Sequence, residues 1–289
     1  MAQDKFSAVW VSHSSISDFL SCPRSYYLKH IFRDTKTGHK IKISSPSLSL
    51  GQAVHEIIES LSVLPVQNRF DKSLIDEFDK AWEKVSGKKG GFHDTDNEYL
   101  YKKRGEEMLL RITKNPGPLK KQAVKIRMDL PYFWLSDLDN IILCGKIDWL
   151  EYLPDTDSVH IIDFKTGKRD EDPNSLQLPI YHLLATNCQK RRVTKTSYWY
   201  IDRSDSLEEK KLPDIESSKS TILKIAKDIQ LARKLNRLKC PHNNGCYACI
   251  PYESIIKGDA EFVGVDELKK DMYIVDGKIN DLIPESDIL

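Results

Sequence analysis

The sequence predicts an α/β fold in which helices pack around a central β-sheet. The first third of the 289-residue chain has helical hydrophobic spacing, and the middle has apolar runs separated by Asp, Asn and Pro. Further helical and strand patterns then alternate, which is typical of a sheet wrapped by helices. We expect one large domain with a small C-terminal appendage.

The N-terminal third is expected to be mostly helical. The segment "VSHSSISDFLSCPRSYYLKHIF" (11–32) begins with serines suited to helix capping and should bend near Pro23. Apolar residues at helical spacing predict three further helices. These cover residues 50–61, 73–85 and 97–113.

Beyond Pro118 the pattern changes to strands, which are interleaved with two helices. The strands are expected at 122–130, 140–153, 158–164 and 195–202, and the helices at 174–188 and 215–235. A cysteine-rich loop follows at 240–249, and "EFVGVDELKKDMYIVDGKI" (261–279) suggests a short β-ribbon.

Composition excludes several classes of protein. Lys and Arg total 44 against 43 Asp and Glu, so the net charge of +1 creates no global attraction for nucleic acid or for acidic membranes. The sequence opens without a secretory signal pattern, and no window approaches the roughly 18 apolar residues of a membrane helix. We therefore expect a cytoplasmic protein without a membrane partner. A G-x-x-x-x-G-K-[ST] motif is absent, so any DNA unwinding requires a helicase partner.

The stretch "IIDFKTGK" (161–168) places an acidic and a basic residue at the end of an apolar strand. A turn joins this strand to the preceding one, so a hairpin brings Asp148 and Asp163 toward the same region. Two nearby carboxylates raise each other's pKa unless a cation lies between them, and Mg²⁺ or Mn²⁺ suits such oxygen ligands. Strand periodicity places Lys165 on the same face as Asp163, where an ammonium can stabilise charge on a phosphate.

Three further motifs accompany this one in a fixed order. The four together resemble the RecB-like branch of the PD-(D/E)xK nuclease superfamily, over about Ser12 to Tyr252. They are G-x-x-x-H at Gly51 and His55, G-x-x-D at Gly145 and Asp148, D-x-K at Asp163 and Lys165, and Q-x-x-x-Y at Gln177 and Tyr181.

The resemblance implies a restriction-endonuclease-like fold, in which helices flank a central mixed β-sheet. It also implies that Mg²⁺ or Mn²⁺ is held by His55, Asp148, Asp163 and the backbone carbonyl of Phe164. Lys165 would be the catalytic lysine beside the two catalytic aspartates. The helix carrying Gln177 and Tyr181 would support the site and contact DNA.

The six cysteines divide into two groups. Cys144 and Cys188 stand alone in apolar neighbourhoods and are expected to be small buried side chains. The segment "CPHNNGCYAC" supplies three cysteines, which leave one position of a tetrahedral metal site to be filled. Cys22 is the expected fourth ligand, although it lies more than 200 residues upstream of Cys240, Cys246 and Cys249.

An early cysteine followed by Pro and Arg, with three cysteines near the C-terminus, resembles the iron-sulfur subset of RecB-like nucleases. That subset includes the CRISPR adaptation nucleases and the AddB-type nuclease domains. The resemblance implies that a 4Fe-4S cluster closes a nuclease domain at residues 1–257 and leaves a β appendage at 258–289. Zinc remains an alternative, because four thiolates also satisfy Zn²⁺.

Because the net charge is nearly neutral, DNA must be held by local residues. Arg24, Lys168 and Arg169 are candidates for phosphate contacts, and the resemblance implies Tyr181 as a further DNA contact. Unpaired bases stack on aromatic side chains in proteins that bind single strands. The candidates for stacking are Tyr26, Tyr27, Tyr99, Tyr101, Trp199 and Tyr200.

The resulting hypothesis is a metal-dependent deoxyribonuclease, more specifically an exonuclease on single-stranded or frayed DNA ends. DNA repair, recombination and CRISPR-type DNA processing are its expected settings. Two alternatives from other classes stay open: a non-catalytic DNA-binding or scaffolding subunit of a helicase-nuclease complex, and a zinc-stabilised structural protein.

Overall fold

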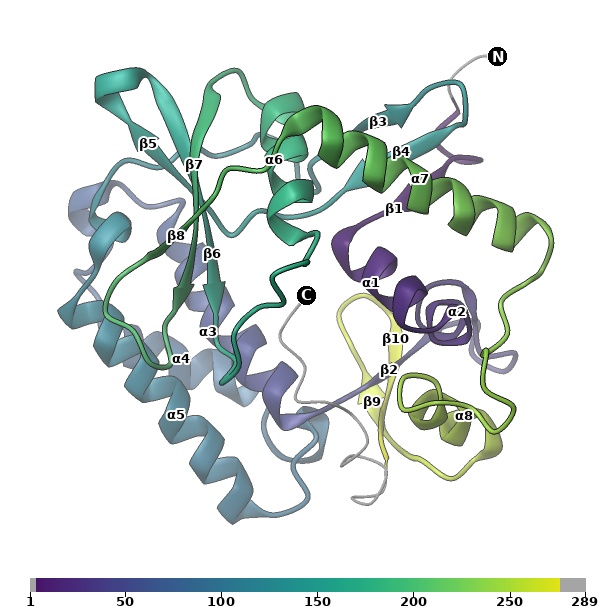
Figure 1. The fold of residues 1–289 in the computed structure, drawn as a ribbon. Coiled ribbons are helices and arrows are strands. Elements are labelled where there is room, and N and C mark those ends of the chain that lie inside the picture. The colour runs from purple at the N-terminus through teal and green to yellow at the C-terminus, as the bar shows by residue number, and fades with distance from the viewer. Residues whose placement is uncertain (1–3, 276–289) are drawn as a thin grey trace.

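A mixed four-stranded sheet forms the centre of the molecule, as predicted. The structure is a computed structural model that describes residues 4–275. The strand order is β5-β6-β7-β8, in which β6 and β7 are parallel and the other two pairs are antiparallel (Figure 1). The α/β architecture is consistent with a restriction-endonuclease-like fold. The strands are β5 (Trp149–Leu153), β6 (Ser158–Lys165), β7 (Arg192–Tyr200) and β8 (Glu208–Lys210).

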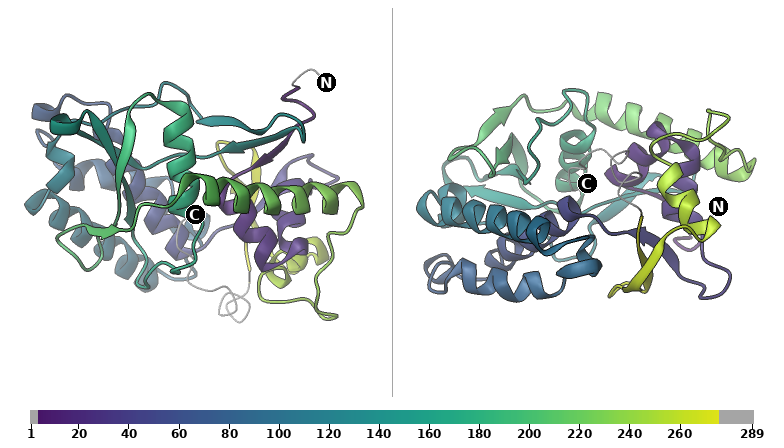
Figure 2. Two further views of the ribbon diagram at one scale, coloured as in Figure 1. Left: turned by 45° about the horizontal axis from the view of Figure 1, so that its top comes forward. Right: turned by 90° about the horizontal axis from the view of Figure 1, so that it is seen from below.

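Helices cover both faces of this sheet, on opposite sides in Figure 2. One layer consists of α3 (Pro46–Leu61), α4 (Leu74–Glu83) and α5 (Thr95–Lys114), and the other contains α6 (Gln177–Cys188) and α7 (Ile215–Lys234). Because both faces are covered, all eight residues of β6 are buried. No helix within residues 4–275 is long and apolar enough to cross a membrane.

The alternation of β6 determines which side chains face which layer. Ile162 and Phe164 join the core formed with α3, α4 and α5, whereas Val159 and Ile161 join the core formed with α6 and α7. Successive side chains of a strand point to opposite faces. Residues 163 and 165 therefore point toward the layer that contains α6.

A second sheet, ordered β1-β4-β3, continues the core on the side of α6 and α7. Its strands are β1 (Val9–Val11), β4 (Ile141–Cys144) and β3 (Tyr132–Ser136). We predicted one strand over 140–153, which was wrong, because residues 145–148 separate β4 from β5 and the two belong to different sheets.

The strand predicted at 122–130 is also wrong. This segment begins alongside β5, where Val124 N donates to Leu150 O at 2.8 Å and Ala123 forms an isolated bridge with Glu151. It then leaves the sheet edge to line a cavity, and the regular strand begins only at Tyr132. Its alternating sequence therefore reflects a half-buried wall rather than a paired strand.

The bend predicted near Pro23 is confirmed. Ser12 and Ser15 form a reciprocal capping box at the start of α1 (His13–Ser21), and α2 (Pro23–Tyr26) follows directly. Proline disfavours helical backbone in the residue before it, and Cys22 is extended, with φ −165° and ψ 118°. Cys22 therefore leaves the helical path between the two helices.

The third sheet joins the two ends of the described chain. The predicted ribbon forms β9 (Glu261–Val265) and β10 (Lys270–Ile274), while its last residues, 276–279, lie outside the described part. We did not predict that β10 would also pair in parallel with β2 (Lys40–Ile43). Ile41, Ile43, Ile255 and Val275 form the small core behind this sheet, against α8 (Ile250–Lys257).

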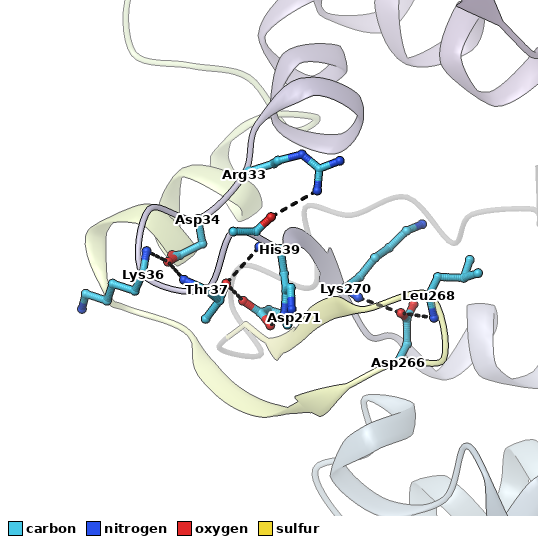
Figure 3. A network of polar contacts seen from close by, with 10 residues as sticks. Arg33, Asp34, Lys36, Thr37, His39, Asp266, Leu268, Lys270 and Asp271 are labelled. Atoms are coloured by element: carbon cyan, nitrogen blue, oxygen red, sulfur yellow. Dashed lines mark hydrogen bonds and ion pairs between the residues drawn. The ribbon is translucent and has the colours of Figure 1, made fainter. Parts of the chain in front are cut away.

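A buried carboxylate ties β10 to the loop that precedes β2 (Figure 3). Asp271 is 1 % exposed and accepts hydrogen bonds from Thr37 Oγ1 at 2.5 Å and from His39 Nδ1 at 2.8 Å. A buried carboxylate without partners is costly, so these contacts hold the sheet together.

Asp271→Ala should lower the free energy of unfolding by about 1–3 kcal/mol, because it removes two hydrogen bonds from a buried group. Denaturant unfolding would measure this loss. The exposed Asp259 offers a matched control, and Asp259→Ala should change stability by no more than about 0.5 kcal/mol. Equal stability of the two variants would contradict a role for the Asp271 contacts.

Candidate active site

Asp148 and Asp163 meet at one end of the central sheet, as the hairpin predicted. The antiparallel register pairs Trp149 with Ile162, which brings the residue before β5 next to the last residues of β6. Asp148 lies just before β5 rather than inside a strand, and its Oδ2 accepts a hydrogen bond from Phe164 N at 3.0 Å. Asp163 is only 2 % exposed.

His55 reaches the same point from α3, in the opposite helical layer. Its Nδ1 lies 3.5 Å from Asp148 Oδ2, and its ring meets the ring of Phe164 edge-on with centroids 6.5 Å apart. His55 Nε2 is buried and has no hydrogen-bond partner among the described residues. The two helical layers therefore both contribute to one site at the end of β6.

Lys165 is buried and surrounded by acceptors. Its Nζ lies 3.1 Å from Asp163 Oδ2 and 2.7 Å from Glu171 Oε2, and it donates a hydrogen bond to Gln177 Oε1. The Gln177 amide nitrogen donates to Asp163 Oδ1 at 2.9 Å and to the Tyr181 hydroxyl at 3.3 Å. The first residue of α6 thus orients the aspartate, the lysine and the tyrosine together.

Burial dominates the electrostatics of the aspartates. Desolvation, with a smaller effect of nearby Asp148, raises the pKa of Asp163 to about 7, and desolvation raises the pKa of Asp148 to about 6. Burial alone would lower the pKa of Lys165, but Asp163 and Glu171 outweigh it and raise that pKa. Lys165 therefore stays charged at neutral pH while both aspartates partly retain protons.

The site has the donor chemistry of a divalent cation site. Three carboxylates, those of Asp148, Asp163 and Glu171, face one ammonium. Two buried atoms, His55 Nε2 and Asp163 Oδ2, have no hydrogen-bond partner in the described chain, although Asp163 Oδ2 lies near Lys165. An imidazole nitrogen beside carboxylate and carbonyl oxygens fits Mn²⁺ or Mg²⁺.

Burial also affects the protonation state of His55, one of the predicted metal ligands. Desolvation lowers the pKa of His55, so its imidazole is neutral and can act as a ligand. The negative charge of Asp163 partly opposes this shift, and the ring of Phe164 packs edge-on against the imidazole. The ligand atoms of His55, Asp148 and Asp163 are less tightly gathered than those of the cysteines described below, so they must contract around an ion.

A cavity of about 660 Å³ opens onto this site. His55, Asp148, Asp163, Gln177 and Tyr181 all line it, and so does Phe164. Lys165 is only 2 % exposed and lies behind them, where its ammonium contacts Asp163. A substrate in the cavity therefore contacts the carboxylates directly. Lys165 acts on it from behind Asp163.

The four cysteines Cys22, Cys240, Cys246 and Cys249 converge, although their positions in the sequence are far apart. Their sulfur atoms all lie within 4.8 Å of one another, and Cys22 and Cys249 are buried. Among the described residues this is the only group of three or more His, Cys, Asp or Glu side chains gathered so tightly. The geometry supports metal binding by these four residues.

The chemistry of the sulfur cluster also fits a metal. Desolvation raises the pKa of Cys22 to about 11 and that of Cys249 to about 12, so metal binding must release protons. The Sγ atoms of Cys246 and Cys249 are 3.8 Å apart. Two Zn–S bonds of about 2.3 Å at a tetrahedral angle give about 3.8 Å. This spacing is compatible with zinc, and the same four thiolates are the ligands that an iron-sulfur cluster requires.

A family model of the PD-(D/E)XK nuclease superfamily matches residues 10–255, which include the paired aspartates, Lys165 and all four cysteines. This chain belongs to the PD-(D/E)XK nuclease superfamily. No curated protein matches it. Membership supports a nuclease function with DNA as the substrate, and nucleases of this superfamily typically use divalent metals.

Two residues of the nuclease site were missed from the sequence. Glu171 forms the 2.7 Å ion pair with Lys165, and His13 lines the cavity at the start of α1. Desolvation lowers the pKa of His13 to about 4, and its buried Nδ1 has no hydrogen-bond partner among the described residues. The sequence indicated Glu171 only weakly, as an acidic residue six positions after Lys165. It did not indicate His13, which lies among the serines that cap the first helix.

The predicted DNA contacts are not gathered at the cavity, with the exception of Tyr181. Arg24 forms a 2.5 Å ion pair with Glu253 beside the cysteines, while Lys168 and Arg169 are exposed in the loop after β6. None of these three basic residues is among the described residues that line the cavity.

The prediction of base-stacking aromatics is wrong for three residues. Tyr26 and Trp199 are 1 % exposed and Tyr200 is 3 % exposed, because all three fill the two cores of the sheet. Tyr99, in contrast, is 64 % exposed on α5. Aromatic residues in a sequence do not distinguish a core from a stacking surface.

The raised pKa of Asp163 predicts a pH-dependent effect on stability in buffer free of divalent metal. Between about pH 4 and 7 the folded state holds a proton that the unfolded state has lost, so this group costs stability as pH rises. The melting temperature of Asp163→Asn minus that of the wild type should therefore increase by several degrees from pH 4.5 to pH 8. Exposed Asp155→Asn is the control, and a difference independent of pH would contradict the prediction.

Cys22→Ser should lose most of the metal bound by purified protein and should lower the melting temperature, because three thiolates cannot complete a four-coordinate site. Elemental analysis and thermal unfolding would measure the two effects. Cys188→Ser is the matched control, since Cys188 lies outside the cluster. Unchanged metal content in Cys22→Ser would exclude Cys22 as a ligand.

Proposed function

We propose that this chain is a Mg²⁺- or Mn²⁺-dependent deoxyribonuclease of the RecB-like branch, acting as an exonuclease on single-stranded or frayed DNA ends. The supporting observation is the convergence of His55, Asp148 and Asp163 on one cavity, with Lys165 hydrogen-bonded behind them. His55, the two aspartates and the Phe164 carbonyl would hold the cation. Once bound, the cation supplies Lewis-acid charge at the scissile phosphate.

The other side chains act on the same phosphate through fixed contacts. Lys165 adds a permanent positive charge that stabilises negative charge developing on the phosphate oxygens. Gln177 holds Lys165 against Asp163, so that neither side chain must reorganise during the reaction. Burial and the aspartates raise the pKa of Tyr181 well above its usual value, so its hydroxyl remains a hydrogen-bond donor for DNA at the cavity wall.

We assign the nuclease to residues 1–257 and a small appendage to residues 258–289. In this proposal the four cysteines hold a 4Fe-4S cluster, with zinc as the alternative, and the metal joins α1 and α2 to the C-terminal loop. The protein acts in the cytoplasm, in DNA repair, recombination or CRISPR-type processing. A helicase partner supplies any unwinding, and Arg24, Lys168 and Arg169 contact DNA outside the cavity.

The test is digestion of end-labelled single-stranded and duplex DNA by anaerobically purified protein with Mg²⁺ or Mn²⁺. Lys165→Ala should lower the cleavage rate by about 10²–10³-fold, because it removes preorganised charge at the phosphate. Asp163→Ala should abolish cleavage with the same metal. Exposed Lys195→Ala is the control and should cleave at the wild-type rate.

The remaining outcomes separate the alternatives. Intact DNA after incubation with folded, metal-loaded wild type would favour a DNA-binding subunit over a nuclease. A ladder of products from one labelled end would support the exonuclease, whereas internal cuts in circular DNA would contradict it. Brown protein with bound iron would support the 4Fe-4S cluster, and colourless protein with stoichiometric zinc would overturn it.

A further inference from the structure

The sheet formed by β2 and β10 presents lysines on one side. Lys40 and Lys270 are direct neighbours in the parallel register, and Lys42 follows on β2. The intervening Ile41 and Ile43 are buried in the small core on the other side of the sheet. The alternation of β2 therefore separates an apolar face from a basic one.

The charges of Lys40 and Lys270 are not paired with a carboxylate among the described residues. No carboxylate in residues 4–275 lies within ion-pair distance of Lys40 or Lys270, and Lys42 reaches Asp266 only at 3.9 Å. Burial lowers the pKa of Lys40, and the positive charges of Lys270, Arg33 and Arg233 lower it further. Two neighbouring lysines without a paired carboxylate create a local positive field that attracts an anion.

This basic face adjoins the candidate active site. Lys270 and Leu268 line the same cavity as Asp148 and Asp163. Asp266 fixes their turn by accepting hydrogen bonds from the backbone nitrogens of Leu268 and Lys270 at 2.9 and 2.8 Å. In Figure 3 the side chains of Lys270 and Leu268 point away from the buried Asp271.

Another part of the cavity lining comes from residues 123–126 and 128–131, which contribute the exposed Lys125 and Leu130. Leu268 is 76 % exposed and Leu130 is 43 % exposed, so the cavity offers apolar side chains as well as cations. A nucleic-acid strand has both a charged backbone and apolar base faces. In a duplex, stacking hides those base faces, so exposed apolar contacts favour an unpaired strand.

We propose that Lys40 and Lys270 form a phosphate-binding site for a single nucleic-acid strand whose scissile phosphate lies at the acidic end of the cavity. Leu268 contacts a base next to these phosphates. This inference rests on the proposed nuclease function and gives the β9–β10 appendage a role in holding the substrate. A phosphodiester chain suits the arrangement, because its phosphates repeat along one strand and can reach both the lysines and the carboxylates.

The test measures binding of a fluorescently labelled oligodeoxythymidine by the full-length protein in buffer without divalent metal, so that no cleavage occurs. The double variant Lys40→Gln with Lys270→Gln should bind at least tenfold more weakly. The slope of log affinity against log salt should fall by about 1.4, since each lost phosphate contact to a single strand contributes about 0.7. Lys40→Arg with Lys270→Arg should retain affinity.

A matched control removes two charges elsewhere. Lys219 and Lys224 are exposed on α7 and do not line the cavity, so their paired Gln variant should bind like the wild type. Thermal unfolding must show that every variant is folded. If the Lys40 and Lys270 double variant matches this control in affinity and salt slope, the site is wrong. Absence of wild-type binding, or equal affinity for duplex and single strand, would also overturn the proposal.

Cleavage assays then separate this inference from the nuclease proposal. If the wild type cleaves DNA with Mn²⁺ but the lysine variants bind normally, the nuclease stands and the strand site fails. If the wild type binds single strands through these lysines and never cleaves, the strand site stands and the nuclease fails. Weaker binding together with a higher KM and an unchanged kcat for the double variant supports both.

Discussion

The burial of like charges at the end of β6 is the constraint on which this site depends. Two aspartates come together at the wall of the cavity, where burial removes part of the hydration that a carboxylate normally keeps. Lys165, Gln177 and the Phe164 backbone nitrogen offset part of that cost through direct contacts. The remaining negative charge destabilises the folded protein and gives the site the donor chemistry of a divalent cation site.

The surrounding fold maintains this burial through contacts between segments that are far apart in the sequence. Cys22 meets the loop at 240–249, and β10 joins β2 in parallel. Both contacts connect the N-terminal helices to the C-terminal segment, on the side of the molecule where α1 and α8 lie (Figure 1). Contacts between such distant segments cost loop-closure entropy, and the hydrogen bonds of the buried Asp271 compensate for part of it.

Charge is distributed unevenly around the cavity, although the chain as a whole is almost neutral. The acidic end lies at β6, whereas unpaired lysines lie on the β2–β10 sheet. Other basic residues form ion pairs and hydrogen bonds within the fold. Arg104, for example, binds Asp202 at 2.8 Å and the carbonyl of Thr166, which stabilises the loop that follows Lys165. Net charge therefore gives little information on where a polyanion binds.

The sequence by itself determined the α/β class, most of the helices, the hairpin that joins the aspartates and the membership of the four cysteines in one group. These features follow from local periodicity and from residue types whose chemistry is specific, such as thiolates and paired carboxylates. Only the tertiary structure decided that residues 140–153 split between two sheets, that Glu171 and His13 join the site, and that Trp199 and Tyr200 are core rather than surface. It alone placed Lys270 beside Lys40, because strand pairing across some 230 residues depends on packing, which leaves no periodic signal in the chain.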